Sequence, residues 1–201
     1  MPTRPSTLRI LVREPGALIA LLIVLACILA ALLAPILAPH DPFETNLMAI
    51  MQPPGGEYLL GTDGQGRDML SRLLFGMRVT LAMGAAALLI GGVIGTVIGL
   101  AAAYWKRLDG LLMRLMDILL SFPAILFGLA IAAIFGPGIT AVVIALSVAT
   151  VPLMARIARS SALVVLGQDF IEAARAQGMG DLMLIRRHLA PNCLSPILVF
   201  A

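Results

Sequence analysis

Long apolar segments constrain the fold of this chain more than any other feature of its sequence. They cover residues 17–37, 79–104, 122–135 and 139–155, and a fifth begins at residue 193. Roughly 20 helical residues cross the ~30 Å hydrocarbon core of a bilayer, and lipid offers no partner for exposed backbone groups. We therefore predict an all-α, polytopic transmembrane helix bundle with four complete spans and the start of a fifth.

The composition indicates the same class. Of the 201 residues, 60% are hydrophobic and only 12% are charged, and the mean hydropathy is +1.02. A soluble domain of this length needs a far larger polar surface. The arginines lie mainly at the ends of apolar segments, so they indicate membrane orientation and not a nucleic-acid-binding patch. Cys27 and Cys193 lie in apolar stretches and form no metal or redox motif.

The positions of the basic residues predict how the chain is oriented. These residues cluster in segments 4–13, 106–114 and 156–187, which are alternate loops between the predicted spans. Because cytoplasmic loops are enriched in Lys and Arg, we expect a multi-pass membrane protein with its N-terminus in the cytoplasm. Its Arg-, Ala- and Gly-rich usage with a single lysine is typical of a GC-rich bacterial gene, so we expect the bacterial inner (plasma) membrane. The apolar run 17–37 is too long for the core of a secretory signal peptide.

The segment after the second predicted span combines interfacial and charged residues. Tyr104 and Trp105 mark a membrane interface, and the helix that follows carries Asp109, Arg114 and Asp117. Arg114 and Asp117 are three residues apart, so we expect them to pair. A charge relay in the membrane is one interpretation. A helix on the membrane surface is the other, and the neighbouring basic residues favour it.

Small side chains recur every four residues in the second predicted span. This spacing predicts a smooth helix face on which the backbone of another helix can approach closely. The residues that we assign to helix packing on this face are Gly91, Gly95 and Gly99. Taken alone, such a face indicates contact between helices and not a pore.

A long polar interruption, residues 169–192, predicts two short helices joined at a glycine. The first is expected to stop at Gly178. The second, residues 181–189, begins with Asp181 as its N-cap, and Pro191 is expected to close it. Two short helices between membrane spans suit docking into a partner's groove better than catalysis.

This segment, called the EAA-like loop below, resembles the EAA loop in the membrane subunits of ABC importers. It matches that pattern at Glu172-Ala173-Ala174, Gly178, Ile185 and Leu189-Ala190-Pro191, with Ala190 where leucine is usual. The resemblance implies a coupling helix that sits in a cleft of an ATPase subunit. The alternative is an ordinary amphipathic loop. The residues that we assign to ATPase coupling are Glu172, Ala173, Ala174, Gly178, Arg187 and Pro191.

A second polar stretch, residues 60–81, is rich in glycine, and Asp68 in it can cap the helix that follows. A calcium site is disfavoured because the D-x-D-x-D-G ligand spacing is absent. The stretch resembles the signature G-T-D-x-x-G-R-D-x-x-S-R-x-x-x-G-x-R-x-[ST]-L of permeases for dipeptides, oligopeptides and nickel, and it matches every fixed position. The branch-signature residues are Gly61, Thr62, Asp63, Gly66, Arg67, Asp68, Ser71 and Arg72.

Together these resemblances imply a permease subunit of a binding-protein-dependent ABC importer with the type I importer permease fold. Dipeptides or oligopeptides are the implied substrates, with nickel, glutathione and other small solutes left open. The implied partners are a second permease subunit, two ATP-binding subunits and an extracytoplasmic solute-binding protein. This chain itself would bind no cofactor, because ATP and Mg²⁺ would bind to the partner ATPases.

The family's usual length implies that the permease domain is incomplete. We expect residues 1–60 to hold the first span and the start of the outer loop. Residues 61–201 would form a permease domain with the EAA-like loop, truncated at its C-terminus.

Two other functional classes are disfavoured. A secondary transporter or channel, which we keep as the alternative, would need ionisable groups deep inside its spans. An enzyme is not indicated, because the sequence has no G-x-S-x-G or H-E-x-x-H motif. It also has no G-x-x-x-x-G-K-[ST] motif for binding ATP.

Overall fold

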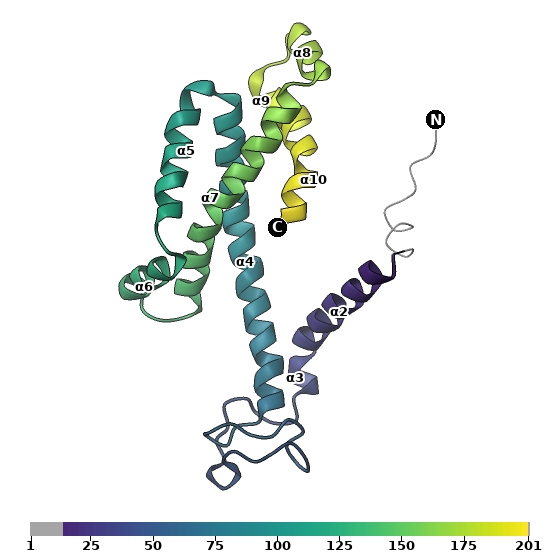
Figure 1. Cartoon of the computed structure of the whole chain (residues 1–201), viewed down its shortest axis with the longest axis vertical. Helices are drawn as coiled ribbons and strands as arrows, with labels where there is room; N and C mark the ends of the chain where they lie inside the picture. Colours follow the sequence, from purple (N-terminus) through teal and green to yellow (C-terminus); the bar gives the residue numbers. More distant parts are fainter. Residues whose placement is uncertain (1–13, 201) are drawn as a thin grey trace. The chain divides into compact units, whose positions relative to one another are not determined.

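The computed structural model describes residues 14–200, and in that range the regular secondary structure is helical apart from two isolated β-bridges (Figure 1). The predicted all-α class is therefore confirmed. The helical elements are α2 (Pro15–Leu32), α3 (Ala34–Leu37), the 3-10 turn η1 (Leu47–Ala49), α4 (Met69–Tyr104), α5 (Lys106–Ser121), α6 (Ala124–Phe135), α7 (Ile139–Leu166), α8 (Asp169–Ala176), α9 (Asp181–Leu184), the π-helical turn η2 (Ile185–Leu189) and α10 (Ala190–Phe200).

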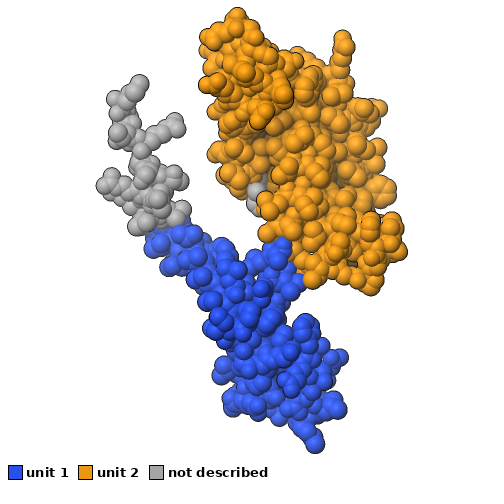
Figure 2. Space-filling view, turned by 180° about the vertical axis from the view of Figure 1, so that it is seen from behind, with its two compact units in different colours: residues 1–82 blue, residues 83–201 orange. Residues whose placement is uncertain are grey.

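The chain divides into two compact units, residues 1–82 and residues 83–201, which are coloured blue and orange in Figure 2. α4 crosses the division, so residues 83–104 belong to the second unit. The glycine-rich loop, which we define as residues 52–72 and which includes the first turn of α4, lies in the first unit. The EAA-like loop lies in the second. Each site described below is contained in one unit.

Within residues 14–200, three helices have the length and hydropathy to cross a membrane: α2 with 18 residues, α4 with 36 and α7 with 28. α5 and α6 pass the same test only as a pair, and that pair is bent by 86°. The third predicted span is therefore not a continuous straight helix, since α6 alone has 12 residues and would reach only about 18 Å. The basic N-terminal residues used to predict orientation lie outside the described residues.

The break between α5 and α6 has a local cause. Phe122 is extended (φ −89°, ψ 131°), as expected for a residue that precedes a proline. Pro123 is extended as well (ψ 131°) and begins the turn into α6. Because a proline disfavours the helical conformation in the residue before it, the helix stops at Ser121. The chain then restarts in a new direction.

The second half of α4 packs against α7 with almost no space between the two backbones. A Cβ added to Gly91 would lie 2.5 Å from the carbonyl oxygen of Ser147, and one added to Gly95 would lie 2.5 Å from that of Val151. Gly99 meets the next turn of α7 in the same way. Because any side chain would collide with the facing backbone, this helix pair requires glycine at all three positions.

Two ion pairs join α5 to α7. Nε of Arg159 lies 2.5 Å from Oδ1 of Asp109, and Nη2 of Arg156 lies 2.5 Å from Oδ1 of Asp117. We predicted that Asp117 would pair with Arg114, three residues back on its own helix. That prediction is wrong, because Asp117 pairs with Arg156 of α7. A guanidinium on a facing helix can approach the carboxylate end-on, and spacing along one helix does not reveal this competitor.

Candidate functional site

The first helix of the EAA-like loop ends in a Schellman motif. The amide of Gly178 donates to the carbonyl of Arg175 at 2.9 Å, and the amide of Met179 donates to the carbonyl of Ala174 at 3.2 Å. Gly178 has a φ of +78°, a left-handed conformation that glycine adopts at little cost. The predicted stop at Gly178 is confirmed, and the chain turns there towards α9.

α8 buries one side and exposes the other. Ile171 is fully buried and Ala174 is 6% exposed, and both pack against Leu184 of α9. Glu172 and Ala173 are exposed. Two residues of the Glu-Ala-Ala triplet can thus touch a partner, whereas the small side chain of Ala174 lets α8 lie close to α9.

The second helix does not end at Pro191, contrary to the prediction. α9 continues through the π-helical turn into α10, so one helical path runs from Asp181 to Phe200. The amide of Ala190 bonds to the carbonyl of Ile185, five residues back. This wider turn makes room for the proline ring directly after it, inside the continuous helical path.

α9 and the π-helical turn present an apolar and basic surface. Leu182 and Met183 are 68% and 56% exposed. With Arg186 and Arg187 they line an open hollow of about 550 Å³. Large apolar side chains gathered beside charges on an exposed face are typical of an interaction site.

A contact that the sequence analysis missed ties α4 to this loop. Oη of Tyr104, the last residue of α4, donates a 2.6 Å hydrogen bond to Oδ1 of Asp181. The guanidinium of Arg175 lies over the same ring, 5.6 Å from its centre. Because 77 positions separate Tyr104 from Asp181, no local pattern indicates the contact. A tyrosine beside Trp105 at the end of a span indicates only a membrane interface.

In the glycine-rich loop, Asp63 is the centre of a hydrogen-bond cluster. Its carboxylate accepts bonds from the amide of Gln65 at 2.9 Å and from the amide and side chain of Arg67 at 3.1 and 2.8 Å. Nε of Arg72 lies 3.5 Å away. The bond from the side chain of Arg67 is the main reason that the pKa of Asp63 falls from 3.8 to about 2. Protein donors therefore occupy the carboxylate that a calcium site would need.

Asp68 caps α4, as predicted, and it is only 2% exposed. Its Oδ2 accepts bonds from the amide and the hydroxyl of Ser71 at 2.9 and 2.6 Å. The amide of His40 donates to the same hydroxyl at 3.1 Å. Burial opposes ionisation of Asp68, but the hydrogen bonds from Ser71 outweigh it, and the pKa of Asp68 lies below its ordinary value.

The remaining signature residues close the glycine-rich loop. Thr62 exchanges bonds with Gln52, whose amide donates to Oγ1 at 2.9 Å and whose carbonyl accepts from the Thr62 amide at 3.1 Å. Gly61 and Gly66 have φ of +76° and +74°. A Cβ on Gly66 would overlap the backbone of Asn46. All eight branch-signature residues thus belong to one hydrogen-bonded and closely packed loop.

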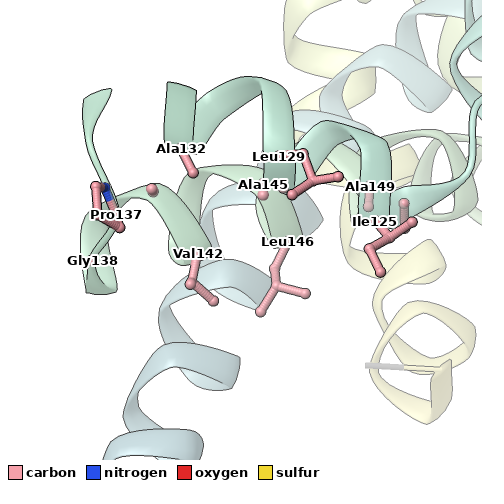
Figure 3. A pocket seen from close by; sticks show the side chains of 12 residues that line it. Ile125, Leu129, Ala132, Pro137, Gly138, Val142, Ala145, Leu146 and Ala149 are labelled. Atoms are coloured by element: carbon pink, nitrogen blue, oxygen red, sulfur yellow. The ribbon is translucent and has the colours of Figure 1, made fainter. Parts of the chain in front are cut away.

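An apolar pocket of about 430 Å³ lies between α6 and α7 (Figure 3). The 12 residues that line it, among them Leu129, Val142 and Leu146, are all apolar or glycine. Because none of them has a side chain that can form a hydrogen bond, the pocket offers nothing to orient a polar ligand. We assign it no role in recognition.

Comparisons with known proteins bear on the same regions. The profile of a family described as binding-protein-dependent transport system inner membrane component matches residues 95–201. The profile described as the N-terminal TM domain of oligopeptide transport permease C matches residues 6–54. The first match takes in α5 to α10 and the whole EAA-like loop.

Individual relatives agree with the profiles. A Brucella suis protein provisionally named as a peptide transport system permease protein is 48% identical over 158 residues, which cover 79% of this chain and 53% of that protein. The dipeptide transport system permease protein of Alkalihalophilus pseudofirmus is 41% identical over 159 residues, covering 79% and 52%. The di/tripeptide transport system permease protein of Pseudomonas aeruginosa is 40% identical over 193 residues, covering 92% and 64%.

The chain spans about half the length of the first two of these relatives. Within this chain, however, the family profile covers residues 95–201, which is more than half of the sequence. Its match takes in the bent α5–α6 pair, the span-length helix α7 and the Schellman turn at Gly178. The chain therefore belongs to the family of binding-protein-dependent transport system inner membrane components and is a multi-pass membrane protein.

Proposed function

We propose that this chain is a transmembrane permease subunit of a binding-protein-dependent ABC importer, and that its EAA-like loop docks on an ATPase subunit. The observation that carries the proposal is the construction of this loop. A fixed turn at Gly178 joins α8 to the helical path that begins with α9, and leaves Glu172, Ala173, Leu182 and Met183 exposed. An ordered backbone that presents apolar and charged side chains is suited to a complementary groove.

We infer that the substrate is a short peptide. Relatives are named for dipeptides, for di- and tripeptides and, in Pectobacterium atrosepticum, for glutathione, which is itself a tripeptide. Nickel, which the sequence leaves open, has no counterpart among these names. The chain would form half of the translocation pathway.

The distribution of basic residues supports an orientation with the N-terminus in the cytoplasm. If α2, α4, the bent α5–α6 pair and α7 each cross the bilayer once, the start of α5 and the EAA-like loop lie on the same side as the N-terminus. Both contain arginines of the basic segments 106–114 and 156–187, as the positive-inside rule requires. An ATPase in the cytoplasm could then reach the EAA-like loop.

We infer that partner subunits, and not this chain, hydrolyse the ATP that drives transport. A second permease subunit would complete the pathway, two ATP-binding subunits would hold ATP and Mg²⁺, and a solute-binding protein would deliver the peptide from outside. Closure of the ATPases would push α8 and rock the membrane helices between inward-open and outward-open states. This chain would bind no cofactor and no nucleic acid, and it would catalyse no reaction.

The experiment is co-purification of the chain with ATPase subunits encoded beside it, comparing Gly178→Asp with Gly180→Asp. Both glycines have open space around them, but Gly178 has φ +78° whereas Gly180 has φ −67°. A left-handed conformation costs a non-glycine residue about 1–2 kcal/mol. We expect Gly178→Asp to reduce ATPase recovery about tenfold or more, with membrane insertion unchanged. Gly180→Asp should bind as the unaltered chain does.

Two results would contradict this function. Equal ATPase recovery with both variants would show that the turn does not organise the docking surface. Failure of the unaltered chain to recover any ATPase, alone or with its second permease subunit, would favour the secondary transporter or channel.

A further inference from the structure

We propose that Tyr104 is a positioning residue that links the EAA-like loop to α4, so that movement of the docked loop is passed to this membrane helix. The inference rests on the proposed ATPase docking for its functional consequence. Its structural part, that Tyr104 holds α8 and α9 in place, stands on contacts within this chain.

Tyr104 touches both helices of the loop with different parts of its side chain. The hydroxyl donates its 2.6 Å hydrogen bond to Asp181, in the first turn of α9. The face of the ring lies 5.6 Å from the guanidinium of Arg175, in the last turn of α8. A phenol bonded to a carboxylate is a charge-assisted pair, and a guanidinium over a tyrosine ring is a cation–π pair. One side chain thus holds the two helices that flank Gly178.

The ring also connects two separate apolar clusters. One consists of Ile171, Ala174 and Leu184 and forms the inside of the EAA-like loop. The other is formed by buried residues of α4, α7, α10 and the π-helical turn, including Leu100 and Ala158. Tyr104 is half-buried and packs against both. Because packed side chains transmit displacement, a shift of the first cluster reaches the second through this ring.

Tyr104 differs from the other residues that pack against both clusters. Val165 and Leu166 do so too, but they end α7, and only two residues separate that helix from α8. Tyr104 is the residue in this group that comes from α4. It therefore provides a second connection from the loop, to a helix that the chain does not join to it directly.

The glycine contacts between α4 and α7 make this second connection effective. At Gly91, Gly95 and Gly99 the two backbones are in direct contact, so α4 and α7 cannot slide past each other without separating. A displacement of α8 is passed to α7 through the two residues that connect these helices, and to α4 through the contacts of Tyr104. The two helices then move as one body, as a rocking mechanism requires.

The first test is hydrogen exchange of the full chain in lipid nanodiscs, comparing Tyr104→Phe with Tyr58→Phe. The substitution removes one oxygen and keeps the ring. We expect amides of residues 169–184 to exchange about fivefold faster in Tyr104→Phe, the factor for the loss of a hydrogen bond worth roughly 1 kcal/mol. Tyr58 is a matched control, since it lies in the glycine-rich loop and its hydroxyl accepts a bond from Asn46. Tyr58→Phe should leave residues 169–184 unchanged.

A second variant tests whether the bond to Asp181 is responsible. Asp181→Asn should accelerate the same amides, and the double variant should exchange no faster than the more affected single variant, because both remove one interaction. Asp169→Asn is its control, since Asp169 lies in the first turn of α8 as Asp181 lies in that of α9. Additive effects, or unchanged exchange in Tyr104→Phe, would overturn the link.

The functional test uses the transporter assembled with its partner subunits. We expect Tyr104→Phe to retain ATPase recovery while peptide uptake per ATP hydrolysed falls at least about threefold, because the loop still docks but, without the bond to Asp181, passes less of its displacement to the joined α4 and α7. Full uptake per ATP alongside faster exchange would overturn the coupling role of Tyr104. The recovery of ATPase by the unaltered chain is measured separately, so failure of docking is distinguished from failure of this link.

Discussion

The two signature loops of this molecule are built in opposite ways. In the glycine-rich loop the polar signature residues bond to one another: Asp63 binds Arg67, and Asp68 binds Ser71. In the EAA-like loop the backbone is equally well defined, but Glu172 and its neighbours are exposed. A recurrent motif can thus encode either a shape or a contact. The hydrogen-bond partners of its side chains show which of the two it encodes.

Left-handed glycines show the same contrast. Gly66 has φ +74°, and a Cβ there would overlap the backbone of Asn46, so both conformation and space require glycine. Gly178 has φ +78°, but nothing lies within 4 Å of the position of its Cβ. Conformation alone requires glycine at 178. The open space around it is available to whatever the loop binds.

The largest effect should come from removing the buried carboxylate of the glycine-rich loop. Asp68→Ala deletes the cap of α4 and leaves the amide of Ser71 buried without an acceptor, which should cost about 3 kcal/mol of local stability. Hydrogen exchange of residues 52–72 in nanodiscs would measure it. Asp41→Ala is the control, since exposed Asp41 makes a similar turn bond to the amide of Phe43 at 2.8 Å. Equal effects of both changes would show that burial of Asp68 is unimportant.

The next largest effect should come from replacing a left-handed glycine with alanine, compared between Gly66 and Gly178. Gly66→Ala should destabilise its loop by about 3 kcal/mol, combining a left-handed backbone with steric overlap. Gly178→Ala should cost its loop only about 1 kcal/mol, for the backbone alone. Hydrogen exchange of both loops measures these costs, with Gly64→Ala as the control because its Cβ would meet open space. A cost at Gly178 equal to that at Gly66 would contradict the proposed openness of the EAA-like loop.

The sequence predicted the features that depend on neighbouring residues. Apolar length predicted α2, α4 and α7 as spans, Gly178 predicted the end of α8, and Asp68 predicted the start of α4. Each of these follows from the cost of leaving backbone groups unpaired in lipid or at a helix end. The assignments of individual residues to ATPase coupling remain predictions.

Features that depend on distant parts of the chain were not predictable. Asp117 was expected to pair with Arg114, but a guanidinium on α7 binds it instead. Tyr104 carried no signal for its contact with Asp181. Pro191 was expected to end a helix, and a π-helical turn before it absorbs the ring. In each case a residue distant in the sequence, or a change of helix geometry, decided the pairing or the helix end, and neighbouring residues alone do not indicate it.

The smallest predicted effect is a pH dependence confined to the glycine-rich loop. The folded pKa of Asp63 is about 2, below its ordinary value of 3.8. The folded loop therefore favours the charged form, so Asp63 stabilises the loop fully above about pH 4, and this stabilisation is lost as the pH falls towards 2. Hydrogen exchange of residues 62–67, corrected for intrinsic rates, should stay constant from about pH 7 to 4 and then rise. In Arg67→Gln the rise should begin at higher pH, because the donor that lowers the pKa is gone. A rise already complete above about pH 5 would mean that another group controls the loop, and the hydrogen bonds of Asp63 would no longer explain why its shape persists.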